Sequence, residues 1–333
     1  MSAIDTTTDV VLARSQASQL SRRDGNARIS IVIPIYNEAM LVDQLADRLR
    51  GALVAPDIDW EAVVVDDGSA DGSFEALCEH HRRDPRFKII RLARNFGHQT
   101  AITAGLEHAS GDAVVVMDGD LQDPPELLPQ LVAKWREGWD VVYTVRRSRK
   151  ESWAKRVAYR MFYRLLRALA RLDIPLDSGD FCLMDRRVLD VVISMRERSR
   201  FVRGLRTWAG FRQTSLSFDR DSRAGGDSKY TTRKLVHLAL DGLVGFSYAP
   251  LRLGTLLGIM AATVSFVGIV VVLYLRLFTA WSIPGFASTS IIILFLGGIQ
   301  LFTLGLIGEY VGRIYDEVRQ RPLFVVRERI GFR

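Results

Sequence analysis

Acidic side chains gather in three short segments of the sequence, residues 34–38, 66–69 and 118–123. In the last segment Asp118 and Asp120 flank a glycine, which lets the chain turn so that both carboxylates face one hard cation. Gln122 adds a third oxygen ligand, directly or through water. Because Mg²⁺ usually takes one or two carboxylates together with substrate phosphates, the segment predicts a Mg²⁺ or Mn²⁺ site for a phosphate-bearing substrate.

The acidic segments lie at the ends of short β-rich runs. The predicted strands cover residues 29–33, 62–65, 87–92, 113–117 and 141–144. They alternate with stretches of helical periodicity, which is typical of an α/β domain with a mostly parallel sheet. Ligands of such sheets bind outside the carboxyl ends of the strands, so we expect the acidic segments to converge at one edge. This convergence favours a metal site over the turns and helix caps in which Asp-x-Asp pairs also occur.

Some residues of these segments allow two interpretations. Residues 66–69 suit a turn and N-cap before a helix over 71–82, and also a ligand contact by Asp67. The ring of Tyr36 is expected either to contact a ligand or to lie half-buried at a strand end. The sequence has no G-x-G-x-x-G and no G-x-x-x-x-G-K segment, which excludes the usual phosphate-binding loops of dinucleotide oxidoreductases and P-loop kinases.

The C-terminal third contains two long uncharged runs, residues 253–275 and 287–308. A helix of that length crosses the roughly 30 Å hydrocarbon core of a bilayer. The stretch between them, 276–286, has one charge and a Pro-Gly pair, so the pattern predicts a two-helix transmembrane hairpin. The excess of Lys and Arg on both flanks predicts that the α/β domain and both termini lie in the cytoplasm. The alternative is a pair of buried helices in a soluble core.

Two amphipathic segments precede the hairpin. Residues 152–172 combine an apolar stripe with arginines on other faces, and residues 234–246 run into the first span. Both suit helices in the membrane interface, the alternative for the first being a surface helix packed on the sheet. The net charge of +7 fits nucleic acid, an anionic membrane or phosphates, and its placement favours the last two. No nucleic-acid partner is expected.

The expected order of domains follows from these segments. It is a disordered tail (1–28), an α/β catalytic domain (29–230), a juxtamembrane amphipathic helix (231–250), two transmembrane helices (251–310) and a cytoplasmic tail (311–333).

Four motifs occur in order along the first half of the chain: IVIPIYNE, VVVDDGSADG, RNFGHQTAITAGLEHASGD and VMDGDLQDPPE. Together they resemble glycosyltransferase family 2, which has the GT-A fold. More narrowly they resemble the membrane-anchored bacterial polyprenyl-phosphate glycosyltransferases, relatives of dolichyl-phosphate mannose synthase. SGDFCLMDRR, RFVRGL, GDSKY and the hairpin extend the resemblance to the C-terminus. It implies an inverting, metal-dependent enzyme of the inner membrane that moves a sugar from a nucleotide-sugar to polyprenyl (undecaprenyl) phosphate.

The resemblance also implies which residues contact the donor. Those expected to hold the nucleoside are Pro34, Tyr36, Glu38 and Asp67. Asp118 is expected near the ribose and the sugar, and Asp120 and Gln122 on the Mg²⁺ or Mn²⁺ ion. Gly119 stands where the family commonly has alanine, and no consequence is expected.

An acceptor phosphate is expected to bind to positively charged side chains. A lipid monophosphate is mostly ionised at neutral pH, because its second pKa is about 6, so it needs orientation and charge more than a strong base. The residues expected to hold it are Arg203, Arg206, Arg223, Ser228 and Lys229. Asp180 falls where related enzymes have an acidic residue near the acceptor. We expect it to be catalytic, with Asp118 and Asp120, by orienting an arginine or by accepting a proton.

The sequence is also compatible with two other functions. One is a processive polysaccharide synthase, although the chain lacks the Gln-x-x-Arg-Trp motif and the further spans usual in that group. The other is a non-catalytic nucleotide-sugar-binding membrane scaffold. UDP-glucose is the first expectation for the donor, with UDP-galactose, UDP-N-acetylhexosamine, UDP-aminoarabinose and GDP-mannose as alternatives. The resemblance also implies a homo-oligomer such as a tetramer.

Overall fold

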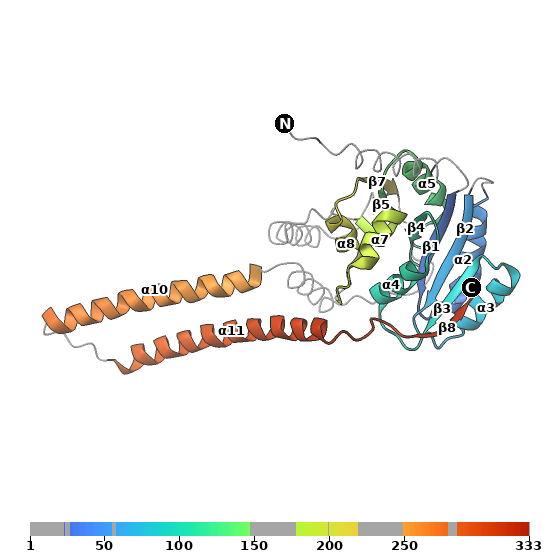
Figure 1. The fold of residues 1–333 in the computed structure, drawn as a ribbon. Helices are drawn as coiled ribbons and strands as arrows, with labels where there is room; N and C mark the ends of the chain where they lie inside the picture. Colours follow the sequence, from blue (N-terminus) through green and yellow to red (C-terminus); the bar gives the residue numbers. More distant parts are fainter. Residues whose placement is uncertain are drawn as a thin grey trace, which may run out of the picture. The chain divides into compact units, whose positions relative to one another are not determined.

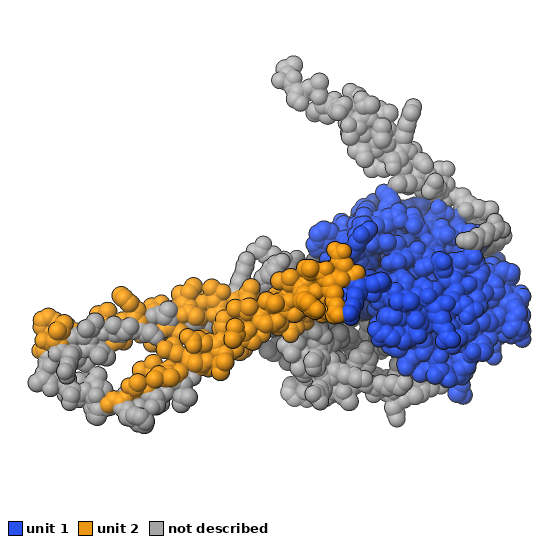
Figure 2. All heavy atoms as spheres, turned by 60° about the horizontal axis from the view of Figure 1, so that its bottom comes forward, with its two compact units in different colours: residues 1–153, 172–228, 321–333 blue, residues 154–171, 229–320 orange. Residues whose placement is uncertain are grey.

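The computed structural model describes residue 23 and residues 27–54, 58–146, 178–198, 200–218, 249–278 and 285–332. Figure 1 shows the helices and strands that these residues form. The chain divides into two compact units, which have different colours in Figure 2. Unit 1 comprises residues 1–153, 172–228 and 321–333, and unit 2 comprises residues 154–171 and 229–320.

An eight-stranded sheet forms the centre of unit 1, with the strand order β7-β5-β6-β4-β1-β2-β3-β8. Five of its strands confirm the predicted ones: β1 (Ala27–Ile35), β2 (Ile58–Asp66), β3 (Phe87–Leu92), β4 (Ala113–Val116) and β5 (Val141–Arg146). β1 pairs in parallel with β2 and with β4, and β2 pairs in parallel with β3. The carboxyl ends of these four strands therefore lie at one edge of the sheet.

Three further strands complete the sheet: β6 (Ser178–Asp185), β7 (Gln213–Phe218) and β8 (Val326–Ile330). β6 lies antiparallel between β4 and β5, and β7 runs parallel to β5. Four of the seven strand pairs are parallel, which confirms a mostly parallel sheet. These three strands were not predicted from the sequence, because each is rich in small, polar or charged residues that are uncommon in strands.

Helices cover both faces of the sheet, because its central strands are apolar on both sides (Figure 1). Ile31 and Ile33 of β1 belong to one core and Val32 to the other. The first core contains residues of α2 (Ala39–Ala52), α3 (Ser73–Arg83) and α5 (Leu128–Arg136), with the short helix η1 (Pro125–Leu127) beside them. The second contains residues of α4 (His98–His108), α7 (Arg186–Ser194) and α8 (Val202–Trp208). Thus α4 and α8 share one face of the sheet.

Unit 2 contains two long helices, α10 (Ala249–Phe278) and α11 (Phe286–Val318), which pack against each other. The two predicted spans fall within them. Among the described residues, one segment, Phe295–Val318, is long and apolar enough to cross a membrane. It begins and ends later than the predicted span over 287–308.

Both predicted tails contain residues that belong to the folded unit 1. The prediction of disorder over residues 1–28 is wrong at Arg23, which is 4% exposed, and at residues 27–28, which begin β1. The prediction of a tail over residues 311–333 is also wrong, because α11 continues to Val318 and β8 pairs antiparallel with β3. An unpaired edge strand exposes a row of backbone hydrogen-bonding groups, and β8 covers the edge of β3.

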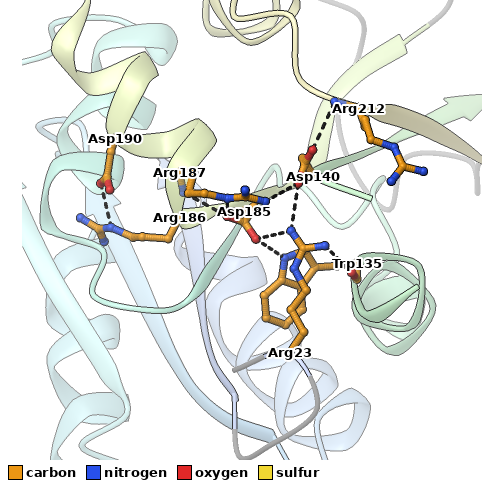
Figure 3. A network of polar contacts seen from close by, with 8 residues as sticks. All are labelled: Arg23, Trp135, Asp140, Asp185, Arg186, Arg187, Asp190 and Arg212. Atoms are coloured by element: carbon orange, nitrogen blue, oxygen red, sulfur yellow. Dashed lines mark hydrogen bonds and ion pairs between the residues drawn. The ribbon is translucent and has the colours of Figure 1, made fainter. Parts of the chain in front are cut away.

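Arg23 is held by a buried polar network (Figure 3). Its guanidinium donates to Asp140 Oδ1 at 2.9 Å and to Asp185 Oδ2 at 2.6 Å, and Trp135 Nε1 also donates to Asp185 at 2.8 Å. Arg187 supplies a second cation, 2.7 Å from Asp140. Asp185 pairs with Ala113 at the start of β4. The network therefore lies at the edge opposite the acidic segments and has a structural role.

Candidate active site

The first two acidic segments contact each other at the carboxyl edge of the sheet. The backbone N–H of Asn37 donates to Ser69 Oγ at 3.0 Å, and the Asn37 side-chain oxygen accepts from the Ala70 N–H at 2.9 Å. Asn37 has a φ of +54°, a left-handed conformation that asparagine adopts more readily than most residues. The segments after β1 and β2 thus form one surface.

Three of the residues predicted to hold the nucleoside lie at the end of β1. Pro34 is buried within the strand, and Glu38 is half-buried at the start of α2, where its N–H donates to Ser73 Oγ at 3.1 Å. Tyr36 is 47% exposed, so its ring is the most accessible of the three.

Asp67 links this surface to the loop that follows β3. Its carboxylate accepts from the Phe96 N–H at 2.7 Å and from the Gly97 N–H at 3.0 Å, and the residue is only 3% exposed. Burial raises the pKa of Asp67, and the two amide hydrogen bonds offset this in part. Asp66 supports the turn that was one interpretation of this segment, because its Oδ1 accepts from the Ser69 N–H at 2.9 Å. Asp67 therefore holds the loop that precedes α4.

The Asp118–Asp120 segment forms a tight turn after β4. Asp120 Oδ1 accepts from the Gln122 N–H at 3.1 Å, which brings these two side chains to the same turn. Leu121 between them has a φ of +59°, an unusual conformation for a bulky side chain, and it is 5% exposed. Such strain persists only where the surrounding structure holds it and is common at functional sites.

Gly119 packs closely against the end of β1. A Cβ here would clash with Ile35 Cδ1 and lie 3.1 Å from the Pro34 carbonyl oxygen. An alanine here needs the flexible end of the Ile35 side chain to shift. That glycine in place of alanine has no consequence for function stays a prediction.

His98, the first residue of α4, lies between two predicted catalytic carboxylates. Its Nε2 is 3.4 Å from Asp118 Oδ1 and 3.8 Å from Asp180 Oδ2. The side chain of His98 is 46% exposed, and its partial burial lowers its pKa, but the carboxylates of Asp180, Asp118 and Asp67 outweigh this and raise the pKa above its usual value. The site therefore favours a charged imidazole among its acidic groups.

Asp180 of β6 accepts hydrogen bonds on both carboxylate oxygens. Arg203 Nη2 lies 3.2 Å from Oδ1, and Gln99 Nε2 lies 3.2 Å from Oδ2. Burial raises the pKa of Asp180, but His98, Arg203 and Arg206 together bring it well below its usual range. The carboxylate is therefore ionised, and it is a weak proton acceptor.

The predicted acceptor residues divide into three groups. Arg203 keeps 20% of its side chain exposed beside Asp180. Arg206 is 1% exposed, and its guanidinium lies 5.4 Å from the centre of the Tyr143 ring of β5, so it is a buried cation with little surface for a ligand. The other three lie outside the described residues: Arg223, Ser228 and Lys229.

Comparison with known proteins decides the family. Residues 30–193 match the family described as Glycosyl transferase family 2. Over 303 residues the chain is 48% identical to an uncharacterized glycosyltransferase, YkcC, of Bacillus subtilis (strain 168), covering 91% of this chain and 94% of that protein. The chain belongs to glycosyltransferase family 2. The resemblance seen in the motifs is thus confirmed, and with it a glycosyltransferase that has the α/β GT-A fold.

Two other similarities extend over most of this family 2 glycosyltransferase. The SfII prophage-derived bactoprenol glucosyl transferase of Shigella flexneri is 36% identical over 312 residues, 90% of this chain and 98% of that protein. Among solved structures, the mannosyltransferase PcManGT from Pyrobaculum calidifontis, in complex with GDP-Man and Mn²⁺, has a TM-score of 0.46 and 19% identity, over 92% of this chain and 94% of that one.

The family 2 site has oxygen ligands that fit a hard cation. Asp120 and Gln122 provide oxygen ligands on one turn, and Mg²⁺ and Mn²⁺ prefer such ligands. Within the part of the chain that the structure describes, no group of three or more His, Cys, Asp or Glu side chains is placed to hold a metal ion. An ion at this turn fits if substrate phosphates and water complete its coordination.

Two residues of this glycosyltransferase site were not predicted from the sequence: His98 and Gln99. Both lie in the RNFGHQ segment. The available signal was the position of two polar side chains directly after Gly97, where a helix begins beyond the carboxyl end of a parallel strand.

Proposed function

We propose that the protein transfers a sugar, with inversion, from a nucleotide-sugar to polyprenyl phosphate. The observation that carries the proposal is the arrangement around His98, where the predicted donor-side Asp118 and the ion pair of Asp180 with Arg203 lie within a few ångströms of one imidazole. The similarity to a bactoprenol glucosyl transferase over 98% of that protein supports a polyprenyl phosphate as the acceptor. UDP-glucose is the first donor to test.

The donor binds at the surface formed by the ends of β1, β2 and β4. Pro34, Tyr36 and Glu38 hold the nucleoside, for which the exposed ring of Tyr36 offers a stacking surface. Asp67 supports this pocket through the loop that its carboxylate holds. Asp118 lies toward the ribose and the sugar.

Asp120 and Gln122 hold a Mg²⁺ or Mn²⁺ ion against the donor diphosphate. When bound, the ion neutralises the charge that develops on the leaving diphosphate. The strained turn at Leu121 keeps these two ligands together.

The acceptor phosphate binds beside Arg203, with Arg223, Ser228 and Lys229 as further contacts. An ionised phosphate oxygen attacks the anomeric carbon and forms the new C–O bond, while the bond from that carbon to the diphosphate breaks and the nucleoside diphosphate leaves with the electron pair. The attack releases no proton, so no general base is needed. Asp180 therefore orients Arg203, and it does not accept a proton.

The apolar helices α10 and α11 anchor the enzyme as a transmembrane hairpin in the inner membrane, with the catalytic domain in the cytoplasm. The segment Phe295–Val318 supports one span, and the charge-free run over 253–275 in α10 supports the other. A polyprenyl chain then stays in the lipid while its phosphate reaches the enzyme.

The test is transfer by purified membranes that contain the protein. Membranes are incubated with undecaprenyl phosphate and each of a panel of labelled nucleotide-sugars, with and without EDTA. We expect one labelled sugar on the lipid, released by mild acid, and no product with EDTA. No labelled lipid with any donor would contradict the proposal, and chains of many sugars would indicate a processive synthase.

A further inference from the structure

The side chain of Gln99 makes two hydrogen bonds in opposite directions. Its Nε2 donates to Asp180 Oδ2 at 3.2 Å, and its Oε1 accepts from the backbone N–H of Val202 at 3.0 Å. The partners determine the orientation of the amide, because a flipped amide would set its oxygen against a carboxylate and its NH₂ against another N–H. Gln99 therefore connects β6 to the beginning of α8.

Together with the bond between Arg203 and Asp180, these contacts form a closed ring of hydrogen bonds at the predicted acceptor site. Val202 is the first residue of α8, and the next residue, Arg203, returns to Asp180 with Nη2 3.2 Å from Oδ1. Phe201 at the N-cap provides no side-chain hydrogen bond to the helix, so the oxygen of Gln99 satisfies an amide that has no partner within α8. The backbone of α8 and the Arg203 guanidinium are thus fixed to the same carboxylate.

The start of α4 is itself well anchored. The Gly97 N–H donates to Asp67, and the Gln99 carbonyl oxygen accepts from Thr103 Oγ1 at 2.8 Å. Ala101 and Ile102, which follow, have no exposed surface. Gln99 therefore projects from a rigid helix end that also contacts the predicted donor pocket.

We propose that Gln99 is a positioning residue that holds α8 against Asp180 and so aims the Arg203 guanidinium at the acceptor phosphate. This role rests on the proposed function. It predicts that losing the Gln99 amide impairs use of the lipid phosphate much more than use of the nucleotide-sugar, although Gln99 touches neither substrate.

The experiment is a double-mutant cycle in the full-length protein. Gln99→Met removes both hydrogen bonds with little change in size. Gln99→Glu keeps an oxygen for the Val202 N–H but places a second carboxylate beside Asp180. Each is compared with Arg203→Ala, with the Gln99→Met/Arg203→Ala double variant, and with Gln130→Met, the same change at an exposed glutamine of α5.

We expect Gln99→Met to raise the KM for undecaprenyl phosphate about tenfold and to leave the KM for the nucleotide-sugar within about twofold. Gln99→Glu should raise the acceptor KM at least as much, and Gln130→Met should change neither value. In the Arg203→Ala background, Gln99→Met should add no further rise, because it acts through that arginine.

Three outcomes would overturn the positioning role alone while wild-type transfer persists: an unchanged acceptor KM in both Gln99 variants, an equal rise in both KM values, or a full additional rise in the Arg203→Ala background. Absence of transfer by the wild-type protein would overturn the proposed function and this role together. If Gln99→Met does not fold, as judged by its melting temperature, the same comparison is made with Gln99→Glu and the Gln99→Glu/Arg203→Ala double variant, and their KM values test the positioning role.

Discussion

Arg203 donates a hydrogen bond to Asp180, with Nη2 3.2 Å from Oδ1. The pair joins the first turn of α8 to the first residues of β6, and both side chains are mostly buried, at 20% and 17% exposed. Burial raises the pKa of Asp180, but His98, Arg203 and Arg206 lower it further than burial raises it. Of the two roles that the sequence left open for Asp180, this relationship favours orientation of an arginine.

Arg203→Ala should impair use of the acceptor. It removes the guanidinium that hydrogen-bonds to Asp180 and that is proposed to bind the phosphate, so we expect the KM for undecaprenyl phosphate to rise about tenfold or more. Arg203→Lys should recover part of the loss, because it restores a point charge without the guanidinium geometry. Steady-state transfer assays with varied acceptor measure both. The control is Arg82→Ala, whose side chain is 70% exposed on α3, and an unaltered acceptor KM in Arg203→Ala would contradict the assignment.

Asp120→Asn should abolish transfer while the fold stays intact. The substitution keeps the size of the side chain and removes the charge that a divalent ion needs. Labelled-sugar transfer with added Mg²⁺ or Mn²⁺ measures activity, and the melting temperature reports the fold. Asp59→Asn, at a side chain that is 62% exposed, serves as the control. Full activity of Asp120→Asn would show that the metal assignment is wrong.

Gly68→Ala should disturb the donor pocket. Gly68 has a φ of +73°, and a Cβ there would lie 2.6 Å from the Arg94 carbonyl carbon and 2.8 Å from the Asn95 amide nitrogen, backbone atoms that cannot rotate away. We expect the loop after β3 to shift, the donor KM to rise about tenfold, and stability to fall by about 2 kcal/mol.

The matched control for Gly68→Ala is Gly51→Ala in α2, where the added Cβ would meet no described atom within 4 Å beyond the adjacent backbone of its own helix. That variant should gain about 0.5–1 kcal/mol of stability and leave the donor KM unchanged. Similar behaviour of the two variants in donor titrations and thermal melts would argue against strain at Gly68.

Glu61→Gln should destabilise the protein in a pH-dependent way. Glu61 has no exposed surface and lies 2.7 Å from Lys88 Nζ. Burial raises its pKa, but hydrogen bonds from Lys88, Ser30 and Ser110 lower it from 4.5 to about 2. Because the folded-state pKa is depressed, the carboxylate contributes about 3 kcal/mol above the unfolded-state pKa, and this contribution is lost as the pH falls from about 4.5 toward 2.

We therefore expect Glu61→Gln to lower the melting temperature by roughly 5–10 °C at neutral pH and by clearly less at a pH of about 3. Thermal melts of the detergent-solubilised protein across this range measure the difference. The exposed Glu107→Gln on α4 should show no such trend. If the difference in melting temperature between Glu61→Gln and the wild type stayed constant with pH, ionisation of Glu61 would not be the cause of the destabilisation.

Sequence patterns predicted the five apolar strands of the sheet and missed β6, which lies inside it, and the two edge strands β7 and β8. β1 to β5 are apolar runs whose residues lie in both cores, so their composition alone indicates buried strands. β8, with the sequence VRERI, carries three charges in five residues and forms only by pairing with β3. The buried Arg23 was missed for a similar reason: its partners Asp140 and Asp185 are more than a hundred residues away in the sequence.

The sequence by itself determined the family, the strands that end in acidic segments and the apolar C-terminal runs, because each depends on residue types at short spacing. Only the tertiary structure decided which charged residues meet. Arg203 and Arg206 lie three apart on α8, yet Arg203 keeps 20% of its side chain exposed against Asp180, whereas Arg206 is buried over Tyr143. The direction in which α8 packs on the sheet separates them, and it is set by contacts between distant segments, such as that of Gln99 with Val202.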